Sequence, residues 1–565
     1  MLFEDVISEV GEFGPYQKRI YCLVCFLSIP TSMHILGTVF IQATPSHRCA
    51  LTWLPNDTYK SQGSWHDAMV KDSIPWEEEN GRFDTCSISR SPANLTNGTI
   101  YCDKWVYSKH TFRSTFVTDA DLVCGDQSLA TYASMLMMTG MLSGSFIMGI
   151  LSDMIGRKKV MILGAVGQCA IAFATAGAKS YPVYATLRFL ITFFGIGMFL
   201  SGFVIAIELV GPSKRKFVGI VIQMFWCIGL FIETGIAYGL RDWRHFQLAI
   251  SMFSVVAVIL YSFLLPESAR WLLQKGRTKE AAKIIQTVAH QNGVVLSDHA
   301  KNLVEVDCGR KVETIWKMFA SPILVFRSLI VLFNWFAASI VYYGLNLKAG
   351  DLSGDIYLNF FLLALVEFLS YFFCLAWLDV KGRKFLQCTS MVTGGVACIA
   401  TLFPVLYWGD DERWMTLTLA LVGKFGISAG FAIICVYSAE LFPTVMRNSA
   451  IGFCSVSARI GGILAPYIAK MEDIIGGNLG VAVPLIIFGG LSLSAGVLVL
   501  FLPETCNKVL PDTLEEAKNF GRSSGSRAER SRSDKDGAGQ AEIPTVTCER
   551  DNTTEEKQRL LRTHE

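Results

Sequence analysis

The chain has few charged residues for its length. Only 17% of its 565 residues are charged and the net charge is +2, so no basic excess indicates a nucleic-acid partner. Apolar residues make up 52% of the chain, and its mean hydropathy is +0.40. Soluble domains carry more charge than this. The composition therefore indicates a protein whose partner is the lipid bilayer.

Several motifs are also absent. The chain contains no G-x-x-x-x-G-K-[ST] phosphate-binding loop, which disfavours an ATP-driven machine. We find no metal-ligand spacing and no grouping of nucleophile, base and orienting residue, so we expect no cofactor, no metal and no enzyme activity. The N-terminus lacks a basic stretch followed by a short apolar core, so we also expect no cleaved signal peptide.

What the chain does have is a series of apolar windows, each long enough to cross a bilayer as a helix. The first six lie near residues 20–41, 128–150, 159–178, 183–207, 217–239 and 246–265. The other six lie near residues 326–346, 357–378, 385–407, 415–438, 449–469 and 482–502. The sequence therefore predicts an all-α polytopic membrane protein with twelve transmembrane helices.

The polar segments between these windows define the expected organisation. It comprises an N-terminal segment (1–19), a six-helix bundle (20–265) with a long loop (42–127), a helical loop (266–322), a second bundle (323–506) and a tail (507–565). The tail is poor in apolar residues and is expected to be disordered. Its segment Glu556–Leu561, "EKQRLL", resembles an acidic dileucine sorting signal.

Basic short loops predict the orientation. They are "GRKK" (Gly156–Lys159), "KRK" (Lys214–Lys216) and "KGRK" (Lys381–Lys384), and they fall on one side of the predicted membrane. Basic loops mark the cytoplasmic side. We therefore expect both termini to be cytoplasmic, the 42–127 loop to be extracellular, and the protein to lie in the plasma membrane.

The 42–127 loop has the features of an extracellular segment. Its even set of cysteines predicts disulfides, with three pairings open: Cys49, Cys86, Cys102 and Cys124. It also contains the predicted glycosylation sites Asn56, Asn94 and Asn97. A further sequon at Asn552 falls in the predicted cytoplasmic tail and is expected to stay unmodified.

The two halves repeat each other. Asp153, Gly156, Arg157 and Lys158 match Asp379, Gly382, Arg383 and Lys384 at an offset of 226. Glu208 and Arg215 match Glu440 and Arg447 in an E-x6-R pattern at an offset of 232. "LLPES" (Leu264–Ser268) matches "FLPET" (Phe501–Thr505) at 237. Because each half crosses six times, the halves enter the membrane in the same direction, as a parallel repeat.

D-x-x-G-R-[RK] after the second and eighth helices resembles the signature of the major facilitator superfamily. The chain more narrowly resembles the organic cation, carnitine and organic anion transporters of the solute carrier group. That resemblance is carried by the Cys-rich loop and by "ATPSHRC" (Ala43–Cys49), "PESARWLL" (Pro266–Leu273), "YYGLNL" (Tyr342–Leu347), "AELFPTVMRN" (Ala439–Asn448) and "LPETCNKVLPDT" (Leu502–Thr513). Sugar porters share the E-x6-R pairs but lack the long loop.

The resemblance implies a carrier that alternates between outward-open and inward-open states. It assigns the repeated acids and bases (Asp153 to Lys158, Glu208 with Arg215, and their counterparts in the second half) to a conformational latch. The simpler alternative is that the bases only set the topology. That alternative does not account for the acids paired with them.

Charges within the predicted spans are candidates for a central cavity. They are Arg188, Glu233, Glu367, Lys424 and Arg459. Helical spacing aligns Glu367 with Asn359 and Ser370, and Arg459 with Ser455 and Gly462. Glu233 shares a face with Gln223 and Trp226, but also with the apolar Leu230. Such stripes fit cavity walls, although small residues also serve helix packing. Arg188 and Glu233 lie nearer the outer ends of their spans, where water or each other can neutralise them.

Aromatic residues complete the predicted substrate site. The resemblance points to Phe203, Trp226, Tyr342 and Phe431, whose faces can hold a quaternary ammonium. It also implies that Arg459 stands where cation-selective relatives carry Asp. With Glu367 nearby, a cavity of both signs suits carnitine-like zwitterions and organic cations. An organic anion exchanger and a transport-inactive receptor or scaffold remain alternatives, and coupling to Na⁺ or to an exchanged counter-ion is open.

Overall fold

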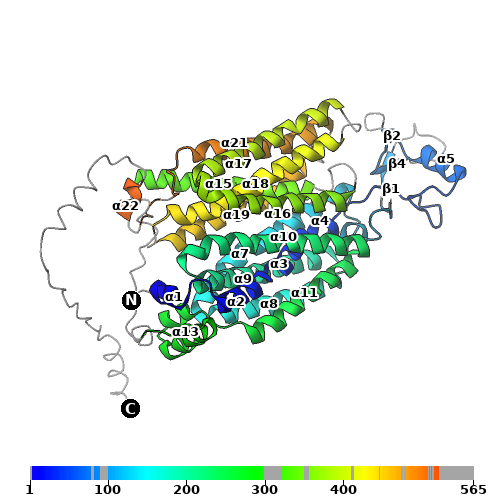
Figure 1. Cartoon of the computed structure of the whole chain (residues 1–565). Coiled ribbons are helices and arrows are strands. Elements are labelled where there is room, and N and C mark those ends of the chain that lie inside the picture. The colour runs from blue at the N-terminus through cyan, green and yellow to red at the C-terminus, as the bar shows by residue number, and fades with distance from the viewer. Residues whose placement is uncertain are drawn as a thin grey trace, which may run out of the picture. The chain divides into compact units, whose positions relative to one another are not determined.

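Helices lying side by side dominate the chain in Figure 1. The computed structural model describes residues 3–77, 82–89, 99–297, 321–348, 355–408, 413–443, 446–471, 475, 477–506, 508, 511 and 514–520. Contacts group Met1–Phe520 into one compact unit. Asn94, Asn97, Asn552 and the dileucine-like segment lie outside the described residues.

Six crossings form the first half. α2 (Pro15–Cys25), α3 (Ser28–Leu36) and α4 (Thr38–Ile41) together make the first crossing. The next five are α7 (Gln127–Ile155), α8 (Arg157–Ala176), α9 (Tyr181–Leu209), α10 (Arg215–Leu240) and α11 (Trp243–Leu264), with a 3₁₀ turn, Pro212–Lys214, before α10.

Six more crossings form the second half. They are α15 (Pro322–Leu347), α16 (Ile356–Lys381), α17 (Arg383–Ala400), α18 (Arg413–Leu441), α19 (Arg447–Ala469) and α21 (Gly477–Val499). The predicted fold class is confirmed. The predicted ninth window, 385–407, is α-helical only in its first part: α17 ends at Ala400, and a π-helical turn, Pro404–Trp408, follows.

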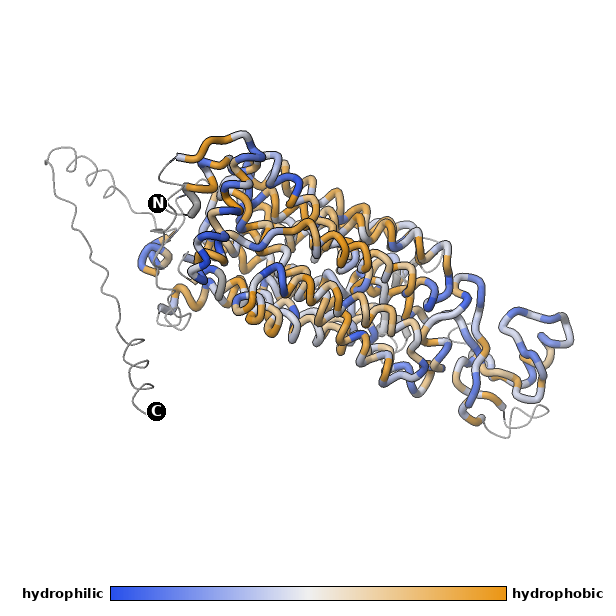
Figure 2. The backbone as a smooth tube through the Cα atoms, turned by 90° about the horizontal axis from the view of Figure 1, so that it is seen from below, coloured by the Kyte–Doolittle hydropathy of each residue, from blue (hydrophilic) through white to orange (hydrophobic). Residues whose placement is uncertain are grey.

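Apolar residues run along the helices and polar ones gather at the two ends of the bundle (Figure 2). Among the described residues, eleven helical segments are long and apolar enough to span a membrane. α17 is not among them, because its 18 residues begin with the charged pair Arg383 and Lys384. Its position among the other helices still makes it the ninth crossing.

Glycines allow the helices of each half to pack closely. A Cβ at Gly140 of α7 would lie 2.3 Å from the carbonyl oxygen of Phe189 on α9. In the second half, a Cβ at Gly426 of α18 would lie 2.5 Å from the carbonyl oxygen of Ser390 on α17. The two halves meet where α10 packs on α16 and α7 packs on α19.

Short helices gather at one end of the bundle, which we call the peripheral-helix end (Figure 1). They are α1 (Phe3–Val10), α12 (Ala269–Gln274), α13 (Thr278–Asn292) and α22 (Leu514–Asn519). Asn292 at the end of α13 donates to the Val10 carbonyl at 3.1 Å and accepts from the Tyr16 amide at 3.1 Å. This side chain therefore joins the 266–297 segment to the start of the chain.

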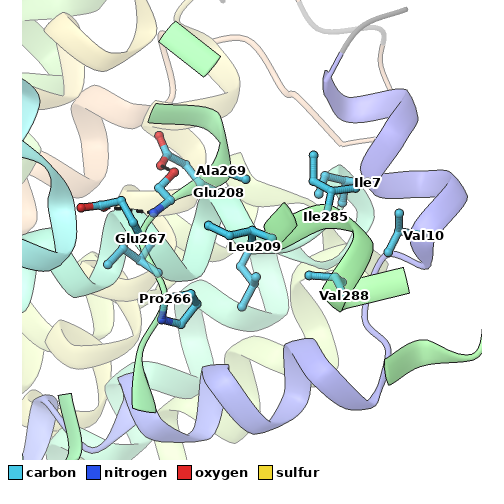
Figure 3. A pocket seen from close by; sticks show the side chains of 12 residues that line it. Ile7, Val10, Glu208, Leu209, Pro266, Glu267, Ala269, Ile285 and Val288 are labelled. Carbon is cyan, nitrogen blue, oxygen red and sulfur yellow. Dashed lines mark hydrogen bonds between the residues drawn. The ribbon is translucent and has the colours of Figure 1, made fainter. Parts of the chain in front are cut away.

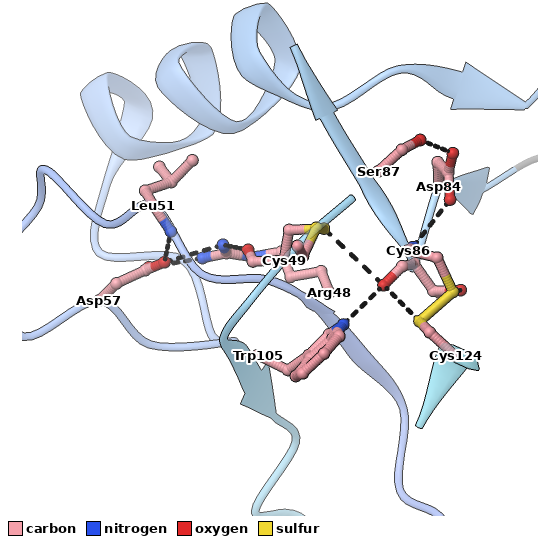
Figure 4. Close-up of a disulfide and its surroundings, with 11 residues drawn as sticks. Arg48, Cys49, Leu51, Asp57, Asp84, Cys86, Ser87, Trp105 and Cys124 are labelled. Carbon is pink, nitrogen blue, oxygen red and sulfur yellow. Dashed lines mark hydrogen bonds and ion pairs between the residues drawn. A yellow bond between two sulfur atoms is a disulfide. The ribbon is translucent and has the colours of Figure 1, made fainter. Parts of the chain in front are cut away.

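The long loop lies at the other end, which we call the strand end (Figure 1). It contains α5 (Ser64–Ser73), α6 (Phe116–Asp119), a 3₁₀ turn (Cys124–Asp126) and three antiparallel pairs: β1 (His47–Cys49) with β6 (Trp105–Tyr107), β2 (Trp76–Glu77) with β3 (Arg82–Phe83), and β4 (Ser87–Ser89) with β5 (Thr99–Tyr101). Disulfides join Cys49 to Cys102 and Cys86 to Cys124, one of the three pairings left open by the sequence. Figure 4 shows the second of them.

A buried ion network supports the same loop (Figure 4). Arg48 donates to both carboxylate oxygens of Asp57, at 2.9 and 2.6 Å, and His66 Nε2 lies 3.0 Å from Asp57 Oδ1. Burial alone would raise the pKa of Asp57. The hydrogen bonds from Arg48, His66 and the Leu51 amide outweigh burial and lower this pKa below its ordinary value of 3.8.

Asp57→Asn is expected to destabilise the loop by roughly 1–3 kcal/mol at neutral pH, the range for losing hydrogen bonds to a charged group. Because the folded-state pKa of Asp57 lies below 3.8, the network stabilises the loop above that value and is lost as the pH falls through the lower, folded-state pKa. The rate of disulfide reduction in purified protein measures this. The wild type should become easier to reduce on acidification, relative to the variant. Equal acid sensitivity in both would contradict the assignment.

Candidate functional site

The centre of the second half contains a buried ion pair between two membrane helices. Lys424 Nζ on α18 lies 2.8 Å from Glu367 Oε2 on α16, and both side chains have 0% exposure. The stripe predicted along α16 is buried at each named position: Asn359, Glu367 and Ser370. Glu367 therefore has its charge compensated inside the protein, rather than standing free in a cavity wall.

Tyrosines surround this pair. Tyr342 and Tyr371 both donate their hydroxyls to Glu367 Oε1, at 2.9 and 3.0 Å. The Lys424 ammonium stands over the Tyr342 ring, 3.6 Å from its centroid. One carboxylate thus receives two neutral donors on one oxygen and a cation on the other.

The first half reaches the same group through Trp226 of α10. Its indole nitrogen donates to the Tyr342 hydroxyl at 3.2 Å, across the seam between the halves. The four predicted aromatics fall into two groups of ring contacts, which this hydrogen bond joins. Phe203 stacks on Phe199, Phe199 meets Trp226 edge-on, and Tyr342 stacks on Phe431 with centroids 6.0 Å apart. Sequence reasoning missed Phe199, Tyr371 and Tyr343.

Arg459 lies beside Tyr343 in the second half. It is half-buried on α19, and its charge acts on the Tyr343 hydroxyl. Tyr343 follows Tyr342, and the two rings meet edge-on with centroids 5.2 Å apart. Adjacent tyrosines therefore connect the Arg459 guanidinium with the Glu367–Lys424 pair. Gln223 on α10 is half-buried and lies one turn before Trp226.

Arg188 and Glu233 form a separate buried group nearer the strand end. Glu233 lies two turns beyond Trp226, about 10 Å along α10. Both side chains have 0% exposure. Arg188 donates to the Thr38 hydroxyl and approaches the Met137 sulfur at 3.1 Å, rather than forming an ion pair with Glu233 within the described structure. The prediction that either residue contacts substrate stays a prediction.

The repeated motifs meet at the peripheral-helix end. In the first half, Arg157 lies 2.8 Å from Asp153 and 3.8 Å from Glu208. Ser268 donates to Glu208 at 2.5 Å. Glu267 accepts the Lys158 amide at 3.1 Å, at the start of α8.

The second half repeats this arrangement residue by residue. Arg383 lies 3.2 Å from Asp379 and 2.9 Å from Glu440, and Thr505 donates to Glu440 at 2.6 Å. Glu504 accepts the amides of Arg383 and Lys384, at 2.9 and 3.0 Å, at the start of α17. The acids Glu267 and Glu504 were missed as site residues, although the repeated P-E-[ST] pattern contained the signal.

The E-x6-R acids contact arginines that lie outside their own E-x6-R pairs. Glu208 and Glu440 lie against Arg157 and Arg383, whereas Arg447 donates through Nε to the Phe442 carbonyl at 3.4 Å. A pairing of Glu208 with Arg215 stays a prediction. Asp379 also pairs with Lys216 of α10 and so joins the two halves at this end.

Figure 3 shows a pocket beside the first of these clusters. Glu208 and Glu267 line one side of it, and apolar side chains of α1 and α13, such as Ile7 and Ile285, line the other. The pocket therefore lies against the motif residues and away from the Glu367–Lys424 pair, so we do not identify it with the central site.

Comparisons with known proteins agree with this architecture. The family model described as "Sugar (and other) transporter" matches residues 89–517. The organic cation transporter protein of Drosophila melanogaster is 37% identical over 542 residues, covering 92% of this chain and 95% of that protein. The beta-alanine transporter of the same organism is 35% identical, covering 92% and 89%.

Solved structures show the same fold. The xylose transporter XylE from E. coli, in a partially occluded inward-open conformation, superposes with a TM-score of 0.58. It is 15% identical in sequence, and the match covers 89% of this chain and all of XylE. At that identity the likeness concerns the arrangement of helices alone.

Proposed function

The chain belongs to the sugar (and other) transporter family of the major facilitator superfamily, and from this we propose that it carries small organic cations and carnitine-like zwitterions by alternating access. The observation that carries the proposal is the buried group of Glu367, Tyr342 and Trp226 at the seam between the halves. A carboxylate with aromatic faces is a suitable environment for an ammonium.

Arg459 supports the extension from cations to zwitterions. Its charge acts on Tyr343, the neighbour of the Tyr342 that donates to Glu367. A guanidinium binds a carboxylate with two parallel hydrogen bonds. Beta-alanine, the compound for which one relative is named, is itself an ammonium joined to a carboxylate by a short chain. The Glu367 carboxylate and the Arg459 guanidinium fit the two ends of a substrate of that form.

The doubled motif clusters support alternating access. Each is an ion network between helix ends, and Lys216 with Asp379 adds a link between the halves. A static receptor or scaffold would need no such link, so we favour a carrier.

An anion exchanger is the second candidate function. Lys424 already compensates the charge of Glu367, so the positive charge of Arg459 remains available to bind an anion. We propose that transport is coupled to Na⁺ or to an exchanged organic ion, and we assign no residue to binding that ion.

Arg459→Asp tests the substrate class. The change is expected to lower carnitine uptake about tenfold or more, because the carboxylate loses its partner and meets a like charge, while tetraethylammonium uptake is kept or rises. Uptake of labelled carnitine, tetraethylammonium and p-aminohippurate in one cell assay measures this. Arg277→Asp, at an exposed site beside α13, is the matched control. Unchanged preference among the three probes would overturn the zwitterion proposal, and p-aminohippurate as the best probe would favour the exchanger.

A further inference from the structure

The cation bound by the central site in this structure is a side chain of the protein itself. The Lys424 ammonium contacts Glu367 at 2.8 Å and stands 3.6 Å above the Tyr342 ring. Those two contacts, a carboxylate and an aromatic face, are the ones that the proposed function requires for a transported ammonium. Glu367 cannot offer a second carboxylate oxygen, because Tyr342 and Tyr371 both donate to Oε1.

Two cations cannot share this place. At 0% exposure the surroundings screen charge poorly, so a second ammonium beside Lys424 would be strongly repelled. We infer that Lys424 is an internal competitor for the cation site: a transported ammonium displaces it from Glu367 and Tyr342. This inference rests on the proposed function and assigns Lys424 the role of selecting the substrate by its charge.

Charge balance gives the direction of that selection. Glu367, Lys424 and Arg459 together carry one net positive charge. A simple cation that displaces Lys424 raises this to two positive charges and leaves the Lys424 ammonium buried without a partner, which is costly. A zwitterion adds no net charge, and its carboxylate offers a new partner to Lys424 and Arg459. Lys424 therefore disfavours simple cations and favours zwitterions.

Chemical rescue separates this role from a purely structural one. Lys424→Ala removes the internal ammonium and leaves room beside Glu367. Methylammonium is then expected to bind the purified variant about tenfold or more tightly than the wild type, and to raise its thermal midpoint. Methanol, which is neutral and of similar size, should have no such effect. Lys283→Ala on α13, at an exposed site, is the matched control and should respond as the wild type does.

Uptake supplies the second readout. In Lys424→Ala cells the ratio of tetraethylammonium uptake to carnitine uptake is expected to rise about tenfold over the wild type. Lys424→Gln, which is neutral but fills more of the space, should show the same change in ratio and replaces the alanine variant if that variant cannot be purified. An unchanged ratio with no methylammonium response would overturn the inference.

The two proposals fail in different ways. Uptake of the organic probes by the wild type, without any response of the Lys424 variants to methylammonium, would refute the role of Lys424 and leave the proposed function standing. A methylammonium response in the variant, without uptake of any of the three probes by the wild type, would uphold the cation site and refute the proposed substrate class.

Discussion

Glu367→Gln is expected to destabilise the protein by about 3–5 kcal/mol and to abolish uptake of cations. The change leaves the Lys424 ammonium at 0% exposure without its carboxylate, and an isolated buried charge costs that amount when its partner is removed. The neutral amide also loses the attraction for a substrate ammonium. The thermal midpoint of detergent-purified protein and the uptake of tetraethylammonium measure the two effects.

A double-mutant cycle separates stability from function. Glu367→Gln with Lys424→Met removes both charges, and buried ion pairs replaced by neutral groups are often tolerated without loss of stability. We expect the double variant to recover most of the midpoint and none of the uptake. Glu280→Gln breaks an exposed ion pair with Arg277 and should change the midpoint little. A single variant as stable as this control would contradict the buried pair.

The fold was largely predictable from the sequence because its signals are long and periodic. An apolar run of about 20 residues has few alternatives to a membrane helix, so each predicted window is helical over most of its length, the first as three consecutive helices. The ninth window changes its type of helix for a local reason. Apolar residues continue past Ala400, but the α-helix gives way to a π-helical turn at Pro404, which composition does not reveal.

The sequence identified several residues of the site, but much less well which side chains they contact. Burial of a charge in an apolar helix identified both Glu367 and Lys424, but nothing in the sequence places α16 against α18. The contact of Glu208 with Arg157 was not predicted, for the same reason. The spacing of residues along one segment does not show which other helix end lies next to that segment. Internal repetition was the exception, since a contact found in one half can be sought in the other.

That repetition extends to the backbone. Gly156 has φ +114° and Gly382 has φ +87°, each between the paired acid and arginine of its motif. A Cβ at Gly156 would lie 2.5 Å from the Glu267 carboxylate, and one at Gly382 would lie 2.6 Å from the Glu504 carboxylate. Both glycines therefore meet two demands at once: a backbone conformation unfavourable to other residues, and room for the acid that accepts the first amides of the next helix.

Gly156→Ala and Gly382→Ala should each destabilise the protein by roughly 1–3 kcal/mol, the cost of a non-glycine residue in such a conformation. Displacement of the Glu267 or Glu504 carboxylate should add to this cost and impair transport.

Gly149→Ala on α7 and Gly490→Ala on α21 are matched controls, because a Cβ at either site meets nothing within 4 Å. Alanine raises helix propensity there, so these variants should be neutral or slightly stabilised. Thermal midpoints and carnitine uptake compare all four. If the motif glycines tolerate alanine as well as their controls do, the carboxylates of Glu267 and Glu504 do not hold the helix starts, and the doubled clusters lose their proposed part in alternating access.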